Sequence, residues 1–251
     1  MQGADVRMTR GPRWGLNDAA VGAIGAVILT LLASLALARG WGTDARLAEV
    51  LAYGVFWGPL FGVVLAASLW RGSGSLGHDF GLRFRPLDLL WGLTIGLLAR
   101  LAASVIEIAG YGRLGTGAAT LGSAASPQVG SPGWWIWLAG VLVLGLLAPV
   151  VIAPFIEELF FRGLLLRAVQ RVTDARPAVA LAVAALVSAS VFALLHVVGS
   201  GSIIETLVVG TGTFVFGLAA ASVTAVTGRL GSAILAHVVF NGLVVVPALL
   251  G

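Results

Sequence analysis

The chain has 251 residues, of which 59% are hydrophobic and only 10% are charged. Its mean hydropathy is +1.02, whereas soluble domains carry about a quarter charged residues, so the composition excludes a soluble globular protein. The net charge is +4, and all 15 basic residues are arginine. These arginines form short clusters between apolar runs, which is typical of membrane orientation signals and not of nucleic-acid binding. Cysteine is absent, which excludes disulfides and thiolate metal sites.

Seven apolar runs are each long enough, at about 20 residues, to cross a bilayer core of about 30 Å as a helix. They are residues 19–38, 50–70, 87–109, 134–153, 179–198, 203–226 and 230–250. A further helical stretch, 154–169, is apolar but carries two glutamates and two arginines. We therefore predict an all-α fold: a polytopic transmembrane helix bundle with seven or eight spanning helices and a polar intramembrane cavity.

The arginine clusters predict how the chain crosses the membrane. The polar tail 1–18 is expected in the cytoplasm, and 19–251 is expected to form a single transmembrane domain in the plasma membrane, with no cleavable signal. Later clusters at 71–85 and 167–176 fall on the same side only if 134–169 is one long helix kinked at Pro154, so we favour that helix over a separate hairpin. The Gly- and Ser-rich segment 110–133 is expected to be an external loop.

Two adjacent glutamates are the first candidate functional residues. Ionisable side chains at bilayer depth are costly, and their default interpretation is functional. Glu158 and Arg162 are four residues apart and share a helix face, so they are expected to form an ion pair. Glu157 then points elsewhere, toward a cavity, where a desolvated carboxylate is suited to general-base catalysis. The alternative is that both glutamates mark the cytoplasmic end of a helix.

Two histidines and an asparagine in later spans form the other candidates. Phe192 and His196 lie on one helical face, but a lone histidine in an apolar helix is often a structural residue. His237 and Asn241 are four apart and converge, so they can donate hydrogen bonds to an oxyanion in a dry cavity. The alternative for this pair is an interhelical hydrogen bond that joins two spans. The third histidine, His78, is interpreted as a solvated loop residue.

The order and spacing of these motifs resemble the CPBP family of membrane peptidases, which includes type II CAAX prenyl proteases and bacteriocin-processing, Abi-type members. The family signature is Glu-Glu-x-x-x-Arg, then Phe-x-x-x-His, then His-x-x-x-Asn. Here the three motifs are Glu157-Glu158…Arg162, Phe192…His196 and His237…Asn241, without departure. The resemblance covers about 154–242, so we place the peptidase motifs in that part of the chain.

The resemblance implies an intramembrane endopeptidase that resembles CAAX prenyl protease 2. Glu157 and His196 would activate a water molecule for attack on the scissile carbonyl. His237 and Asn241 would stabilise the resulting oxyanion. These roles agree with those that helix spacing suggests for the same four side chains.

The other two motif residues, Glu158 and Arg162, would support the geometry of the site. The family is often labelled metalloprotease, although its better-studied members look like metal-independent, glutamate-dependent enzymes. Glu157, His196 and His237 would be the ligands if a zinc ion were present, since catalytic zinc usually takes three protein ligands and a water. However, the chain has no His-Glu-x-x-His motif. We therefore favour water activation without a cofactor, with zinc as the alternative.

The expected partners are the lipid bilayer and a peptide or membrane-protein substrate that reaches the cavity from the cytoplasmic side or the bilayer. A prenylated C-terminus is one alternative for that substrate, and nucleic acid is not expected. Two other functions stay open: a non-catalytic immunity or scaffold membrane protein of the same fold, and a proton-coupled transporter. For the transporter, Arg100 and Glu107 are interpreted instead as a structural pair, and Glu205 as an interface residue.

Overall fold

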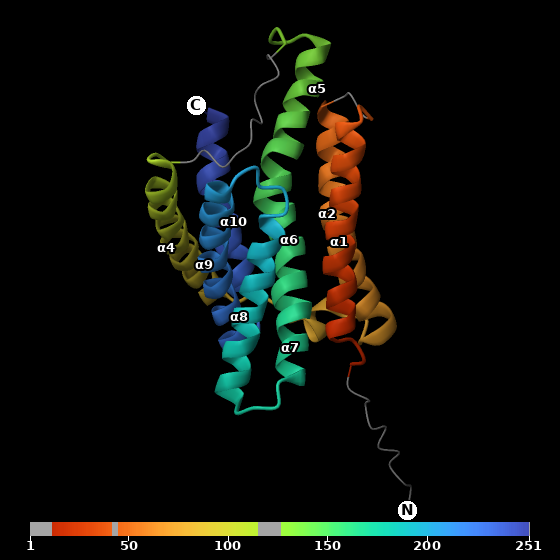
Figure 1. Cartoon of the computed structure of the whole chain (residues 1–251), viewed down its shortest axis with the longest axis vertical. Helices are drawn as coiled ribbons and strands as arrows, with labels where there is room; N and C mark the ends of the chain where they lie inside the picture. The colour runs from red at the N-terminus through yellow and green to blue at the C-terminus, as the bar shows by residue number, and fades with distance from the viewer. Residues whose placement is uncertain (1–11, 42–44, 115–126, 251) are drawn as a thin grey trace, which may run out of the picture.

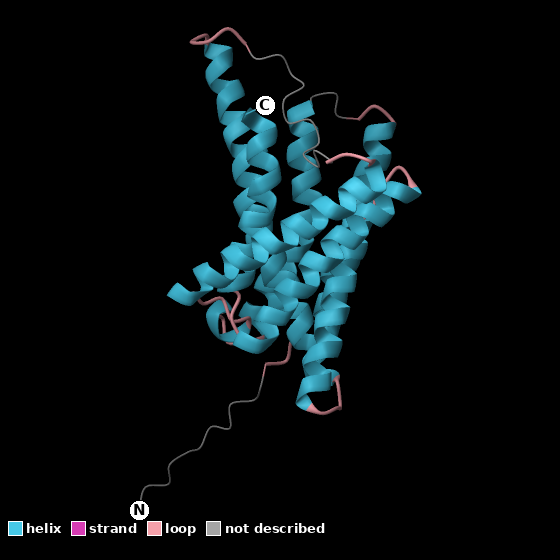
Figure 2. Ribbon diagram, turned by 90° about the vertical axis from the view of Figure 1, so that its left-hand side faces the viewer, coloured by secondary structure: helices cyan, strands magenta, loops and turns pink. Residues whose placement is uncertain are grey.

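The computed structural model describes residues 12–41, 45–114 and 127–250, which form a bundle of helices without strands (Figures 1 and 2). Seven helices in these ranges are long and apolar enough to cross a membrane, which confirms the predicted all-α, polytopic fold. The chain is therefore a multi-pass membrane protein. The elements are α1 (Leu16–Ala38), α2 (Ala45–Arg71), α3 (Leu76–Asp79), α4 (Pro86–Tyr111), α5 (Pro132–Gly140), η1 (Val141–Ile152), α6 (Ala153–Glu158), η2 (Leu159–Leu165), α7 (Leu166–Val172), α8 (Pro177–His196), α9 (Ile203–Thr227) and α10 (Gly231–Leu250).

The fourth span is one continuous helical stretch of 41 residues, Pro132–Val172, which comprises α5, η1, α6, η2 and α7. Figure 1 shows it as a single column through the bundle. The preference for one long helix over a separate hairpin is thus confirmed. Two of its segments, η1 and η2, are π-helical. The first return to α-helical winding occurs at Ala153, beside Pro154, where the sequence predicted a kink.

Proline and glycine set the helix boundaries. Pro86, Pro132 and Pro177 each occupy the first turn of a helix, where the missing N–H is not needed. Gly112 and Gly228 end α4 and α9 in the left-handed conformation that favours glycine, with φ of 69° and 68°. Proline at the start and glycine at the end therefore define the boundaries of these spans.

Helices α4 and α10 pack closely, and both contribute residues to the cavity described below. A Cβ atom added to Gly92 would lie 2.5 Å from Leu235 Cβ, and one added to Gly96 would lie 2.7 Å from the Ala236 carbonyl oxygen. Small residues four apart allow helix backbones to approach in this way in a membrane. Helix α9 packs on both α4 and α8, while α1 and α2 pair and contact the long helix.

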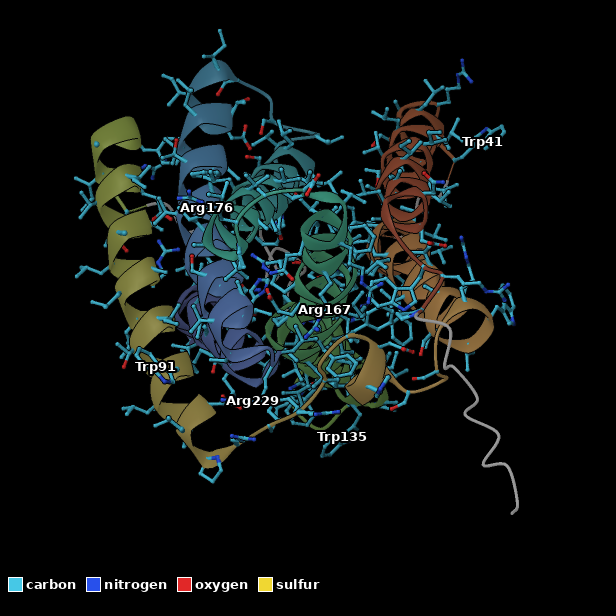
Figure 3. All side chains as sticks on the ribbon, turned by 90° about the horizontal axis from the view of Figure 1, so that it is seen from below. Trp41, Trp91, Trp135, Arg167, Arg176 and Arg229 are labelled. Atoms are coloured by element: carbon cyan, nitrogen blue, oxygen red, sulfur yellow. The ribbon has the colours of Figure 1, made fainter. Side chains whose placement is uncertain are left out.

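Most arginines gather at one end of the bundle, where α1, α4, α8 and α10 begin and α2, α7 and α9 finish (Figure 1). We call this the arginine-rich end; Figure 3 looks along the bundle from it and labels Arg167, Arg176 and Arg229. Its described arginines are Arg13, Arg71, Arg83, Arg85, Arg167, Arg171, Arg176 and Arg229. Tail residues 1–11 and loop residues 115–126 lie outside the described residues, so the predictions for those segments are not examined by the structure.

Hydrogen bonds hold the arginine-rich end together. Arg229 Nη2 donates to Asp88 Oδ1 at 2.8 Å, and Ser232 Oγ donates to the same oxygen at 2.8 Å. The side-chain hydrogen bonds to Asp88 raise the pKa of Arg229 above its usual value, so this arginine stays charged. The connection between α9 and α10 is thereby joined to the start of α4.

Candidate active site

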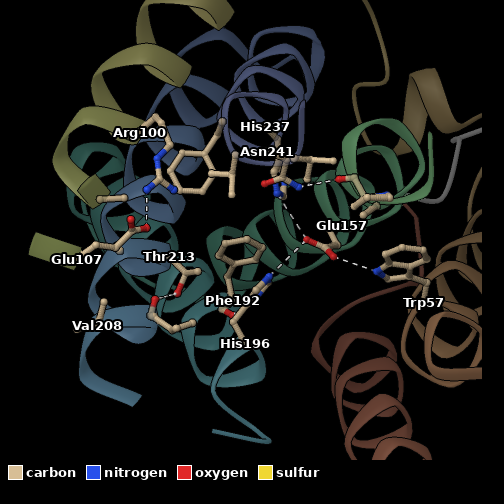
Figure 4. A pocket seen from close by; sticks show the side chains of 18 of the residues that line it. Trp57, Arg100, Glu107, Glu157, Phe192, His196, Val208, Thr213, His237 and Asn241 are labelled. Atoms are coloured by element: carbon tan, nitrogen blue, oxygen red, sulfur yellow. Dashed lines mark hydrogen bonds and ion pairs between the residues drawn. The ribbon is translucent and has the colours of Figure 1, made fainter. Parts of the chain in front are cut away.

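A cavity of about 370 Å³ lies between α2, α4, the long helix, α8, α9 and α10. Its walls include all four residues that the sequence proposed for catalysis, Glu157, His196, His237 and Asn241 (Figure 4). Three helices contribute them: Glu157 comes from α6, His196 from α8, and His237 and Asn241 from α10, while α2 adds Trp57. The structure therefore brings the predicted site residues together around one space.

Glu157 is the acidic centre of this cavity. It lies in α6, with only 4% of its surface exposed. Oε1 accepts a hydrogen bond from the Trp57 indole nitrogen at 3.0 Å. Oε2 lies 3.8 Å from Nε2 of His196 and 3.8 Å from Nε2 of His237. The indole thus orients the carboxylate so that its second oxygen faces both imidazoles.

The tautomer of His196 follows from its position in the last turn of α8. Its Nδ1 lies 2.8 Å from the Phe192 carbonyl oxygen, which can only accept a hydrogen bond, so Nδ1 carries the proton. In the neutral ring, Nε2 then presents a lone pair toward Glu157. The Phe192 ring packs against the imidazole with ring centroids 4.2 Å apart. The phenylalanine of the Phe-x-x-x-His motif therefore fixes both the position and the tautomer of the histidine.

Behind the cavity lies a fully buried ionic network. Glu158 and Arg162 are both 0% exposed, and Arg162 Nη1 donates to Glu158 Oε1 at 3.0 Å, which is the pair that their spacing predicts. Arg162 Nη2 also donates to the Gly217 carbonyl of α9 at 3.2 Å. Glu158 Oε1 accepts a second hydrogen bond, 2.8 Å long, from His237 Nδ1. One carboxylate thus joins the long helix to α10, while the arginine reaches α9.

Asn241 is held by the backbone of the long helix. Its Nδ2 donates to the Pro149 carbonyl oxygen at 2.8 Å. At the end of η1 the Ala153 N–H bonds to the Ala148 carbonyl, five residues back. The next N–H in this register would come from Pro154, which has none. The Pro149 carbonyl therefore lacks its helical donor, and Asn241 supplies one from α10.

Trp57 is a site residue that sequence reasoning missed. Its indole stacks on Tyr53, one turn earlier in α2, with centroids 4.4 Å apart and planes 10° from parallel. The Tyr53 hydroxyl in turn donates to the Leu144 carbonyl of the long helix at 3.2 Å. A tryptophan inside a spanning helix needs an acceptor for its N–H, and this was the available signal. The sequence alone did not indicate which acceptor it meets.

The remaining ionisable candidates lie where their spacing suggested. Arg100 and Glu107 form an ion pair within α4, and both line the cavity at its far side from Glu157 (Figure 4). Glu205 accepts a hydrogen bond from the Gly201 N–H at the start of α9, outside the cavity. The His78 side chain is 71% exposed beside Asp79, as expected of a solvated residue, but it lies in the short helix α3 and not in a loop.

The distances between the three side chains considered as zinc ligands can be compared with those of a tetrahedral zinc site. Ligand atoms on a tetrahedral zinc with bonds near 2.1 Å lie about 3.4 Å apart. Glu157 Oε2 is 3.8 Å from each histidine Nε2, which is wider than that spacing. Among the described residues, no group of three or more His, Asp or Glu side chains is arranged to hold a metal ion. As placed, Glu157 Oε2 lies too far from either imidazole for a tetrahedral zinc ion unless the side chains shift.

The fold and the cavity define a class: a polytopic helical membrane protein with a carboxylate and two imidazoles facing one another inside the bundle. Residues 135–243 match the family described as "Rce1-like: Type II CAAX prenyl endopeptidase Rce1-like". Over this segment the chain is similar to a CAAX-type family of membrane peptidases, and the matched segment contains all six motif residues. No curated protein and no solved structure matches the chain. The family acts on peptide or protein substrates in the membrane.

Proposed function

We propose that the chain is an intramembrane endopeptidase that uses Glu157 and His196 to activate a water molecule. The observation that carries the proposal is the carboxylate oxygen, Glu157 Oε2, which faces the Nε2 atoms of His196 and His237 at 3.8 Å inside the cavity. Polar atoms at that separation are too far apart for a direct hydrogen bond, but a water molecule to one side of the line that joins them can bond to both.

The reaction begins with this water. Glu157 takes one proton as the oxygen attacks the scissile carbonyl carbon, while the Nε2 lone pair of His196 accepts a hydrogen bond from the second proton. A tetrahedral intermediate forms with its negative charge on the former carbonyl oxygen. When the carbon–nitrogen bond breaks, Glu157 returns the proton to the departing amine. The carboxylate is thereby regenerated, and one water is consumed.

His237 and Asn241 are proposed to stabilise the oxyanion. The Nδ1–H of His237 donates to Glu158, so its Nε2 donates as well only when the ring is an imidazolium. The Asn241 amide uses one N–H on Pro149 and keeps the other for the substrate. Two donors at the oxyanion contribute where the charge develops.

The test replaces Glu157 by glutamine, which keeps the shape and removes the base. Cleavage should fall at least about 100-fold, because a general base contributes that much or more. Peptide profiles of membranes from cells that express the natural chain, Glu157→Gln or Glu205→Gln provide the measurement. Glu205 lies outside the cavity, so its variant serves as the matched control. Full cleavage by a folded Glu157→Gln protein would reject the proposal.

Independence from metal is part of the same proposal. It rests on the donor spacing around Glu157 and on the proton-transfer roles above. Purified enzyme treated with a chelator should retain its activity. Activity that is lost with the chelator and restored by zinc alone would assign Glu157, His196 and His237 as ligands instead.

A further inference from the structure

The cavity lies toward the end of the bundle opposite the arginines. In α4 its lining residues run from Arg100 to Tyr111, the last residue of the helix. In α9 they occupy only the first half of the helix, beginning at Val208. In α8 they are confined to the last turn, Phe192 and His196. Each of these segments lies in the part of its helix that is farther from the arginine-rich end. Tyr111, at the far rim of the cavity, is 37% exposed.

A solid core separates the cavity from the arginine-rich end. Every residue from Glu157 to Leu166 along the long helix is buried. The start of α10 is closed in the same way, from Leu230 through Ile234. Arg162 lies in this layer at 0% exposure, surrounded by aromatic rings, and its guanidinium carbon is 4.5 Å from the Phe192 ring centroid. A peptide therefore has no route to Glu157 through this part of the described protein.

The distribution of arginines indicates which end faces the cytoplasm. Of the described arginines at the two ends of the bundle, eight lie at the arginine-rich end and three at the other, namely Arg39, Arg46 and Arg113. Short connections that stay in the cytoplasm carry the excess of basic residues in membrane proteins. The arginine-rich end is therefore assigned to the cytoplasm, and the open side of the cavity to the other face.

We propose that the active-site cavity opens to the extracytoplasmic side, so that its substrates are polypeptide segments exposed on that side of the membrane. This inference rests on the proposed peptidase function and specifies where its substrate is found. The sequence expectation is access from the cytoplasmic side or the bilayer. The inference differs from the cytoplasmic route, because no residue that lines the cavity lies in the arginine-rich ends of α4, α8 or α9. Exported peptides and the outer segments of membrane proteins satisfy it, whereas cytoplasmic prenylated tails do not.

The natural absence of cysteine makes the test direct. Leu114→Cys places a thiol just after α4, near the cavity rim, where the leucine is 59% exposed. Arg176→Cys places one in the exposed connection between α7 and α8. A membrane-impermeant maleimide added to intact cells should label Leu114→Cys within minutes and should label Arg176→Cys only after permeabilisation. Both must label in detergent, which confirms that each protein is made and each thiol is reactive.

A third variant examines the cavity itself. Val208→Cys lines the wall formed by α9. A small charged methanethiosulfonate added to intact cells should modify it and remove most of the Glu157-dependent cleavage products, compared with the same variant before modification. Labelling of Arg176→Cys in intact cells, or of Leu114→Cys only after permeabilisation, would overturn the assignment. Because labelling needs no catalysis, repeating it with Glu157→Gln separates a wrong orientation from a wrong catalytic role.

Discussion

The two halves of the long helix are continuous, but they differ in burial, in helix type and in what their side chains contact. The half before Ala153 is partly exposed, π-helical along η1, and lines the cavity with Pro149. The half after it is buried from Glu157 to Leu166 and carries an ion pair at 0% exposure. Two adjacent glutamates end α6, at the start of this buried stretch, and they face different surroundings. Glu157 faces the cavity, whereas Glu158 faces the core.

The comparison shows that two carboxylates on adjacent residues can serve different purposes, one in the cavity and one in the core. Successive side chains on a helix point about 100° apart, so neighbours face different surroundings. Glu158 gains an arginine and a histidine as partners, and its Oε1 accepts a hydrogen bond from each. Glu157 gains an indole hydrogen bond and two imidazoles at a distance that leaves it available for chemistry. The core carboxylate should therefore control stability, and the cavity carboxylate should control rate.

Removing the core carboxylate should have the largest effect. Glu158→Ala leaves the Arg162 guanidinium buried without its counter-ion, so the free energy of unfolding in detergent should fall by about 3–5 kcal/mol. Denaturant titration followed by tryptophan fluorescence gives the measurement. Combining Glu158→Ala with Arg162→Met removes both charges and should recover a large part of the loss. A single variant as stable as the natural protein would show that the network contributes little.

On the cavity side, Asn241→Ala should reduce kcat by about 100- to 1,000-fold, because in the proposed mechanism Asn241 donates to the oxyanion. KM should change little, since the ground-state carbonyl needs that donor less than the transition state does. Asn17, the only other asparagine, is exposed near the start of α1, so Asn17→Ala is the matched control. A rise in KM with unchanged kcat would instead assign Asn241 to substrate binding.

A smaller effect is expected at Trp57, which orients the cavity carboxylate. Trp57→Phe keeps a ring against Tyr53 but removes the N–H that donates to Glu157. A hydrogen bond to a charged group contributes about 1.5–3 kcal/mol, so kcat should fall by at least about 10-fold. Trp70→Phe, at the exposed end of the same helix, should leave kcat unchanged. If kcat and its pH profile match the natural enzyme, Trp57 has no positioning role.

The smallest effect concerns Asp79, outside the spans. Burial alone would raise the pKa of this carboxyl, but hydrogen bonds from Ser68 and Ser73 outweigh it and lower the pKa. A lowered pKa in the folded state means that the stabilisation is present above the unfolded value of about 3.9 and is lost as pH falls through the folded value. Asp79→Asn should therefore lower the Tm by a few degrees at pH 7 and by less at acidic pH.

Thermal melts in detergent across pH 3 to 7 test this expectation, with Asp174→Asn as the control because Asp174 lies exposed between α7 and α8. If the Tm difference between Asp79→Asn and the natural protein grew as the solution was acidified, the pKa of Asp79 would not be lowered in the folded state.

Much of the fold could be predicted because hydrophobic length is read directly from the chain. Seven spans and the single long helix follow from apolar runs and arginine placement. The π-helical winding of η1 and η2 could not be predicted, because no residue pattern distinguishes it from α-helix in a uniformly apolar stretch. The prolines indicated a disturbance, but not its kind.

Within the candidate site, contacts inside one helix could be predicted from residue spacing, whereas contacts between helices could not. The pairing of Glu158 with Arg162 follows from a four-residue interval. The contact between Glu158 and His237 joins residues 79 positions apart, and that between Trp57 and Glu157 joins residues 100 apart. Helix periodicity carries no information on such contacts. The side on which the cavity opens is likewise a property of how the helices assemble.

The hydrogen bond between Asn241 and Pro149 has a consequence for how the site can vary. Its acceptor is main chain, so no change of side chain at position 149 can delete it. The vulnerable point is position 154, where any residue other than proline would restore an N–H that competes for the same carbonyl. Substitutions there would release the asparagine amide to rotate. Sequence change in the long helix is thus tolerated at the acceptor itself and restricted five residues downstream, at a proline that acts through the N–H it lacks.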